Sequence, residues 1–309
     1  MRRKSSRPSA SISRLSSESV NPASKDLDLK NSLEIARLIN AEDAKVAAAV
    51  KRALPEVARA IDLIVTALQR GGRLIYVGAG TSGRIAALDA AECPPTFNTA
   101  PETVQYVIAG GIKALGSAVE GNEDSRKLGE REIAKKKPGK NDVVVGIAAS
   151  GRTPFTVAAI QYARRRGAKT VAVTCNRGSQ LAKAAEVAIV TEVGPEVIAG
   201  SSRMKAGTAQ KMVLNMLSTG AVTRLGYVYG NLMVNVHLKN EKLVERGITI
   251  LQKATGVGRA AAERMLQAAG SVPAALVMFH AEVDRTDAAR ALHTANNNVR
   301  AAISAARSL

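Results

Sequence analysis

Short, uninterrupted apolar runs recur along the middle of the chain, and segments with helical spacing separate them. Runs of this kind, without polar alternation, are typical of strands that are buried on both faces of a sheet. They predict five strands, at residues 73–77, 104–109, 143–148, 169–174 and 187–190. Because helical segments lie between the strands, the pattern predicts parallel βαβ units and an α/β fold, a doubly wound sheet with helices on both faces.

Apolar positions with helical spacing account for most of the remaining chain. They predict helices over residues 32–39 and 44–68, with Pro55 at a helix start or bend. Further helices are expected at 82–92, stopped by Pro94 and Pro95, at 154–166, and from about Met204 to Arg224. Beyond these the pattern changes to short Ala-rich helices. We therefore predict three parts: a tail at 1–16, an α/β domain with N-terminal helices at 17–254, and a small helical subdomain at 255–309.

The net charge of +18 is unusually high for 309 residues. Five basic residues and no acid lie in the first fourteen positions, a Ser-rich stretch without the apolar core of a secretory signal, so we expect a disordered basic tail. The remaining excess is spread over the chain, for example at 135–137 and 164–166. A solvated basic surface is the simplest interpretation, and attraction of anionic ligands or loose nucleic-acid contact is the alternative.

Composition excludes several classes of function. Aromatic residues make up 3% of the chain and Trp is absent, which argues against a base-stacking surface and specific nucleic-acid recognition. Cys93 and Cys175 cannot form a disulfide framework, which fits the reducing cytoplasm. The three histidines lack metal-ligand spacing, so no metal site is expected. No apolar run approaches the ~18 residues that a membrane-spanning helix requires.

Candidate chemistry lies in two loops that follow the first and third predicted strands. Residues 78–84 (Gly-Ala-Gly-Thr-Ser-Gly-Arg) form the first loop, and residues 150–154 (Ser-Gly-Arg-Thr-Pro) form the second. Each lies where a strand ends and a helix begins, and unpaired N–H groups at a helix start favour anions. The loops predict a phosphate cradle at the crevice of the sheet, built from Thr81, Ser82, Ser150, Gly151 and Thr153.

Each loop also has an ordinary interpretation. Ser150 and Thr153 are suitable helix caps, and residues 78–83 match the G-x-G-x-x-G pattern of dinucleotide enzymes. The short chain to the next strand, and the lack of an acidic residue closing that strand, weigh against a dinucleotide.

Four motifs together resemble the N-acetylmuramic acid 6-phosphate etherases, which carry a sugar-isomerase (SIS) domain. They are the two loops, Glu-Cys-Pro-Pro at 92–95, and Ser-Ser-Arg-Met-Lys-Ala-Gly-Thr-Ala-Gln-Lys at 201–211. The likeness extends from about Ser17 to Gly256 and more weakly beyond. A general sugar-isomerase domain shares the loops but neither of the other two motifs. The resemblance implies a five-stranded sheet of flavodoxin-like order.

The resemblance also implies a reaction and its residues. The family removes the D-lactyl ether from N-acetylmuramic acid 6-phosphate by elimination and then addition of water, without a metal or organic cofactor. Its two carboxylates correspond to Glu92, the proton donor to departing lactate, and Glu123, a second acid–base group. Ser201, Ser202 and Lys205 are candidate substrate contacts, although they also suit an ordinary helix start.

The chemistry explains why two carboxyl groups are needed. The oxygen of an ether is a poor leaving group unless a carbanion forms on the neighbouring carbon. The C1 aldehyde of the open sugar makes this possible, because it acidifies the C2 proton. A base takes that proton while an acid protonates the departing oxygen. We expect Glu92, after an apolar helix, to be partly buried and protonated, and Glu123, in the acidic turn 120–125, to be ionised and act as the base.

The spacing of Ser82 and Glu92 constrains the site. Ten residues on one helix correspond to roughly 15 Å, which exceeds the distance from phosphorus to C3 of a hexose phosphate. Either the second loop holds most of the phosphate or a second subunit supplies one carboxylate. By resemblance we expect a homodimer whose site lies near the interface.

Two other functions remain compatible with the phosphate loops. An aldose–ketose isomerase on the same fold needs only one glutamate, and release of lactate without a ketose product would distinguish the etherase from it. A non-catalytic sugar-phosphate sensor is the second alternative. A transcriptional regulator would require a helix-turn-helix, which the first thirty residues lack, and a kinase regulator would be expected to have lost the two carboxylates.

Overall fold

The computed structural model describes residues 19–238 and 240–308, and the tail predicted at 1–16 lies outside them. The described chain separates into two compact units. The first runs as far as Asp89 and resumes at Gln105–Leu217, and the second combines Ala90–Val104 with the chain from Ser218 onward.

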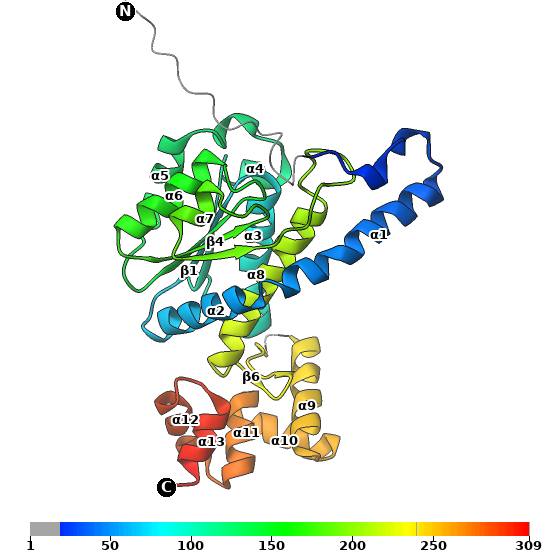
Figure 1. Ribbon diagram of the computed structural model, residues 1–309. Coiled ribbons are helices and arrows are strands. Elements are labelled where there is room, and N and C mark those ends of the chain that lie inside the picture. The colour runs from blue at the N-terminus through cyan, green and yellow to red at the C-terminus, as the bar shows by residue number, and fades with distance from the viewer. Residues whose placement is uncertain (1–18, 239, 309) are drawn as a thin grey trace, which may run out of the picture. The chain divides into compact units, whose positions relative to one another are not determined.

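A five-stranded parallel sheet forms the centre of the first unit (Figure 1). Its strands are β1 (Leu74–Gly78), β2 (Val104–Ile108), β3 (Val143–Ile147), β4 (Lys169–Thr174) and β5 (Val187–Val190). The order β2-β1-β3-β4-β5 confirms the predicted doubly wound, flavodoxin-like sheet. In this order β1 and β3 are neighbours, with Gly78 opposite Ile147, so the loops that follow them emerge side by side.

Helices cover both faces of the sheet, as predicted. On one face α5 (Arg126–Ala134), α6 (Pro154–Arg165) and α7 (Gln180–Ala184) enclose a core that includes Ile75, Val144, Phe155, Ile160 and Leu181. On the other face α2 (Leu54–Gln69) contacts β1, β3 and β5. The helix α1 (Ser32–Lys51) begins with a capping box between Asn31 and Glu34. The break before α2 falls at residues 52–53, and Pro55 occupies the first turn of α2.

The helix after β1 differs from the prediction. It was expected to stop before Pro94, but α3 runs over Gly80–Phe97 with Pro94 and Pro95 inside it. The turn closes beyond the prolines, because the amide of Asn98 donates to the carbonyl oxygen of Pro94 at 2.9 Å. Each proline removes one N–H donor, and near the end of a helix that loss does not prevent a further turn. The short helix after β2 is α4 (Lys113–Gly116).

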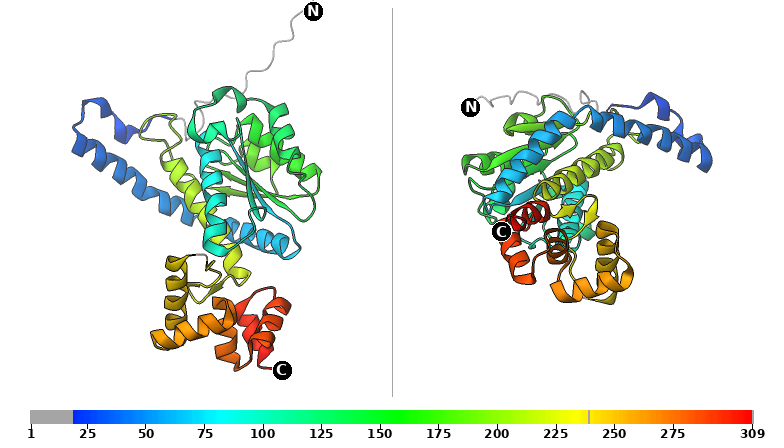
Figure 2. Two further views of the ribbon diagram at one scale, coloured as in Figure 1. Left: turned by 180° about the vertical axis from the view of Figure 1, so that it is seen from behind. Right: turned by 90° about the horizontal axis from the view of Figure 1, so that it is seen from below.

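The second unit is helical. The long α8 (Lys205–Arg224) leads into it and is followed by a small hairpin of β6 (Val228–Tyr229) and β7 (Leu232–Met233). Five helices complete it: α9 (Glu241–Thr255), α10 (Arg259–Ala269), α11 (Val272–Ala281), α12 (Arg285–Thr294) and α13 (Val299–Ala306), shown from yellow to red in Figure 2. Their core includes Leu251, Leu276 and Ile303.

Candidate active site

The first loop joins β1 to α3 at a point where glycine is required. A Cβ on Gly78 would lie 2.8 Å from the amide nitrogen of Gly83, and a Cβ on Gly83 would lie 2.5 Å from Cγ1 of Ile108 on β2. These contacts hold the start of α3 close against the sheet. Thr81 is half-buried and Ser82 is buried in the first turn of the helix.

The second loop joins β3 to α6 and is anchored by residues at and just after the end of β4. The carbonyl oxygen of Ala149 accepts hydrogen bonds from the Cys175 amide at 2.9 Å, the Thr174 hydroxyl at 3.2 Å and the Asn176 side-chain amide at 3.0 Å. Gly151 has φ +65°, and a Cβ there would lie 2.2 Å from Oγ of Ser179. The backbone of this loop is therefore fixed before any ligand binds.

The polar groups of the second loop lie at the start of α6. The hydroxyl of Ser150 accepts a hydrogen bond from the Arg152 amide at 3.2 Å. Thr153 is the N-cap residue of α6, and its side chain makes no capping hydrogen bond. A helix start of this kind offers N–H groups and a partial positive charge to an anion. The structure thus brings the two predicted loops together at the carboxyl edge of neighbouring strands.

The motif at 201–211 also reaches the first loop, through its residues on α8. One turn into α8, a Cβ on Gly207 would lie 3.5 Å from Cγ2 of Thr81, which is an ordinary packing distance. Further along, Oε1 of Gln210 accepts a hydrogen bond from the Ser82 hydroxyl at 2.9 Å. Ser201 and Ser202 are half-buried in the turn before the helix. Three sequence segments that we predicted to bind substrate therefore lie in one region of the first unit.

Lys205 lies in a buried ion pair. Its side chain is 2% exposed, and its Nζ atom lies 2.5 Å from Oε2 of Glu42 on α1. Burial alone would raise the pKa of Glu42, but hydrogen bonds from Lys205 and Lys45 outweigh it and lower that pKa to about 2. The ammonium group of Lys205 is therefore engaged inside the unit, which suits a residue that positions the start of α8.

Two further polar residues beside this pair were not predicted as site residues. The carboxylate of Glu196 accepts hydrogen bonds from the amides of Lys205 at 3.0 Å and Ala206 at 2.9 Å, so it caps α8. Nε2 of Gln210 is buried and has no hydrogen-bond partner among the described residues. Gln210 stands in the motif at 201–211, but Glu196 and Glu42 carry no local sequence signal.

A backbone hydrogen bond ties Glu123 to the start of α6. Its carbonyl oxygen accepts a hydrogen bond from the amide of Phe155, the second residue of α6, at 2.9 Å. The segment before it is tied to the first loop, because Arg84 donates to the carbonyl oxygens of Ala114 and Ser117, each at 2.9 Å. The Glu123 side chain is exposed. One predicted carboxylate thus lies in a segment anchored to both phosphate loops.

Glu92 lies in the last turns of α3, in the part that belongs to the second unit. Its side chain is exposed, so the expectation that it is partly buried is wrong. The prediction failed because α3 does not end before the prolines. It continues past Pro94 and Pro95, with Cys93 and Phe97 on its buried face and Glu92 on its exposed face.

No group of three or more His, Cys, Asp or Glu side chains that could hold a metal ion occurs within residues 19–238 and 240–308. None of the helices in the described part of the chain is long and apolar enough to cross a membrane.

The fold and the loops define a class of protein. The model of the SIS domain matches residues 136–220, and that of the glucokinase regulatory protein N-terminal SIS domain matches residues 56–164. Among solved structures, a phosphoheptose isomerase from Francisella tularensis superposes with a TM-score of 0.50 at 18% identity, over 62% of this chain and 97% of that one. The chain is an SIS-domain protein.

Curated relatives narrow the class to one family. An N-acetylmuramic acid 6-phosphate etherase from Symbiobacterium thermophilum is 57% identical over 274 residues, which is 88% of this chain and 91% of the relative. One from Aeromonas hydrophila is 51% identical over 286 residues, 92% and 96% of the two chains. The chain belongs to the N-acetylmuramic acid 6-phosphate etherase family.

Proposed function

We propose that this chain is a carbon–oxygen lyase that cleaves the D-lactyl ether of N-acetylmuramic acid 6-phosphate, giving N-acetylglucosamine 6-phosphate and D-lactate in amino sugar recycling. The observation that carries the proposal is the family membership, at 57% identity over nearly the whole chain. The local geometry supports it, because Glu123 lies in a segment anchored to both loops.

The second loop is the main holder of the substrate phosphate in this proposal. Ser150, Gly151 and Thr153 surround the start of α6, where the backbone can approach an anion closely. Thr81 and Ser82 contribute from the first loop, and Ser201 and Ser202 contact the sugar. Lys205 acts through its buried pair with Glu42, holding the turn that carries the two serines.

The two glutamates divide the acid–base work. With the sugar ring open, Glu123 removes the C2 proton, and Glu92 protonates the oxygen that leaves C3 as lactate. Water then adds to the resulting double bond while the same pair runs in reverse. The carboxyl groups supply all the proton transfers, so the reaction proceeds without a metal or an organic cofactor.

Glu92 is exposed in the single chain, and a general acid works best in a site that is closed to bulk water. We therefore place the working site in a homodimer, in which the partner subunit covers this part of α3. On dilution, activity per chain should fall with the dimer fraction measured by sedimentation. Full activity in a monomer would exclude the shared site.

The decisive assay incubates the protein with N-acetylmuramic acid 6-phosphate and measures D-lactate enzymatically. Stoichiometric lactate and N-acetylglucosamine 6-phosphate are expected. A ketose phosphate without lactate would identify an isomerase, and binding without either product would identify a sensor.

Two matched variants test the assignment of the glutamates. Glu92→Gln should retain exchange of the C2 proton in deuterated water while lactate release falls by about 10²-fold or more. Glu123→Gln should lose both. If Glu123→Gln retains full exchange, the two roles are reversed.

We also place the protein in the cytoplasm, where a phosphorylated amino sugar would be handled. Cys93 and Cys175 are both buried and form no disulfide among the described residues, which suits a reducing compartment. Cell fractionation with an antibody against the chain tests this placement.

A further inference from the structure

Basic side chains gather at the edge of the sheet opposite the phosphate loops. Parallel strands start at one edge, and the helices that return the chain end there, so the ends of α5, α6 and α7 meet at the starts of β3, β4 and β5. We call the exposed basic residues of these segments the basic edge: Lys135, Lys137, Lys140, Arg164, Arg165, Arg166, Lys169 and Lys183.

Hydrogen bonds and close packing join the segments of the basic edge within the first unit. The amide of Lys169 donates to the carbonyl oxygen of Asp142 at 3.0 Å, which places the start of β4 beside the start of β3. A Cβ on Gly167 would lie 3.8 Å from Cβ of Lys140. The Arg164 guanidinium donates to the carbonyl oxygen of Ala184 at 3.2 Å, and this bond joins the end of α6 to the end of α7.

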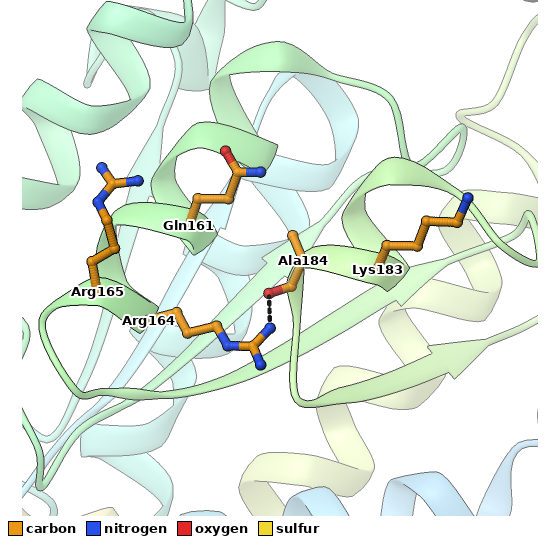
Figure 3. Close-up of a pocket in the computed structure, with 5 residues that line it drawn as sticks. All are labelled: Gln161, Arg164, Arg165, Lys183 and Ala184. Carbon is orange, nitrogen blue, oxygen red and sulfur yellow. Dashed lines mark hydrogen bonds between the residues drawn. The ribbon is translucent and has the colours of Figure 1, made fainter.

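A shallow hollow of about 640 Å³ lies within the basic edge, lined by Gln161, Arg164, Arg165, Lys183 and Ala184. Figure 3 shows Arg164 reaching to the carbonyl oxygen of Ala184, with Lys183 on one side and Gln161 and Arg165 on the other. Within the described part of the chain, no acidic side chain lines this hollow. Its polar lining presents guanidinium, ammonium and amide donors together.

The acids near the basic edge neutralise only part of it. Glu130 pairs with Arg165 at 3.0 Å, Glu186 pairs with Lys169 at 3.1 Å, and Glu132 pairs with Lys135 at 2.6 Å. These pairs are solvent-exposed, and the interaction energy of exposed ion pairs is small. The side chains of Lys140, Arg166 and Lys183 are exposed and make no hydrogen bond or ion pair with the described residues.

The positive charge of the basic edge lies too far from the two loops to bind the substrate phosphate. Strands of five residues at ~3.3 Å per residue separate the basic edge from the loops by about 16 Å. We propose that the basic edge is a second binding surface, which takes the phosphate backbone of a nucleic acid duplex without regard to sequence.

Three features favour a phosphate polymer over other anionic partners. The positive charges extend across the ends of several helices and strands. This arrangement suits a polymer of repeated phosphates better than one small ion. None of the exposed large apolar side chains of the described residues lies in these segments, so a membrane would find no apolar anchor. The Arg165 guanidinium lies over the ring of Tyr162, 5.8 Å from the ring centre. It occupies that face of the ring, so the ring does not offer the face to an unpaired base for stacking.

The test uses the full chain and a fluorescein-labelled 20-base-pair DNA duplex, with binding followed by anisotropy across a salt series. The edge variant carries Lys140→Glu, Arg166→Glu and Lys183→Glu. A control variant carries Lys51→Glu, Lys253→Glu and Arg264→Glu, which are exposed basic residues elsewhere with the same total charge change.

We expect the edge variant to bind at least tenfold more weakly at low salt and to have a shallower salt dependence, by about two to three in the log–log slope. The control variant should bind within about twofold of the unchanged chain, and both should keep lactate release. Equal weakening in both variants would show a general effect of net charge and overturn the proposal. Edge-dependent binding to phosphatidylserine vesicles but not to the duplex would overturn it too.

Discussion

At position 151 a side chain has no space. Gly151 combines φ +65° with contacts that would place a Cβ 2.2 Å from Ser179 and 2.6 Å from the Thr174 hydroxyl. Gly151→Ala should lower the free energy of unfolding by more than about 2 kcal/mol, from backbone strain and overlap, and should raise KM.

The Gly178→Ala variant separates backbone strain from steric overlap. Gly178 has a similar φ of +67° but open space around its Cβ position, so its variant measures strain alone. Urea denaturation and steady-state kinetics of the two variants compare them directly. Equal effects would mean that the contacts with Ser179 and Thr174 do not shape the loop.

The pair of Glu42 and Lys205 makes a prediction about pH. The pKa of Glu42 is about 2 in the folded chain, below its ordinary value of 4.5, so folding favours the ionised form. The stabilisation is complete above pH 4.5 and is lost as pH falls toward 2, a pH-dependent contribution of about 3 kcal/mol. Glu42→Gln should therefore be less stable at pH 7 by about 3 kcal/mol or more, and the difference should shrink in acid.

Lys45→Met is the matched control for that pair. Lys45 contacts the same carboxylate but its side chain is 61% exposed, so its loss should cost less than about 1 kcal/mol. Thermal unfolding at several pH values measures both variants. A pH-independent gap between Glu42→Gln and the unchanged chain would contradict the ion-pair account.

At the scale of elements, the packing of α5 on α6 positions the acidic turn. A Cβ on Gly129 would lie 2.2 Å from the carbonyl oxygen of Phe155, the residue whose amide holds Glu123. Gly129→Ala must push α5 away from the start of α6. We expect lower thermal stability and a fall in kcat, because Glu123 moves with the helix that follows it.

Gly116→Ala provides the comparison, since nothing lies within 4 Å of a Cβ at that position. Its kcat and melting temperature should stay near those of the unchanged chain. If Gly129→Ala lowers stability without changing kcat, then the α5–α6 contact does not position Glu123.

The elements show which parts of the fold the sequence could predict. β4 and β5 match their predicted ranges, and the other strands differ by a residue at their ends, because continuous apolar runs bounded by Gly or polar residues are strong local signals. The helix α7, with five residues, and the β6–β7 hairpin, with two residues per strand, were not predicted because periodicity cannot appear over such lengths.

In the candidate site, too, features with a local sequence signal could be predicted and features that depend on the tertiary fold could not. The loops at 78–84 and 150–154 could be predicted because their chemistry is local. The partner of Lys205 could not, since Glu42 lies 163 residues away and only the tertiary fold joins them. The exposure of Glu92 was missed because the prolines after it suggested a helix end.

At the scale of the whole molecule, a net charge of +18 attracts an anionic substrate. We expect kcat/KM to fall as ionic strength rises from about 10 mM to 200 mM, with kcat nearly constant, because screening slows encounter and leaves chemistry unchanged. The edge and control variants, which both lose six charges, should show equally reduced salt dependence. A kcat that falls in parallel would instead indicate that salt disturbs the site.

The anchor of Glu123 has a consequence for how this architecture can diversify. The bond that fixes the acidic turn joins two backbone groups, the Phe155 amide and the Glu123 carbonyl oxygen, and almost any residue at 123 can supply that oxygen. Exchanging the side chain therefore removes the proposed proton carrier and keeps this backbone bond. An enzyme built this way stands one or two substitutions from a receptor that captures the same metabolite and leaves it intact.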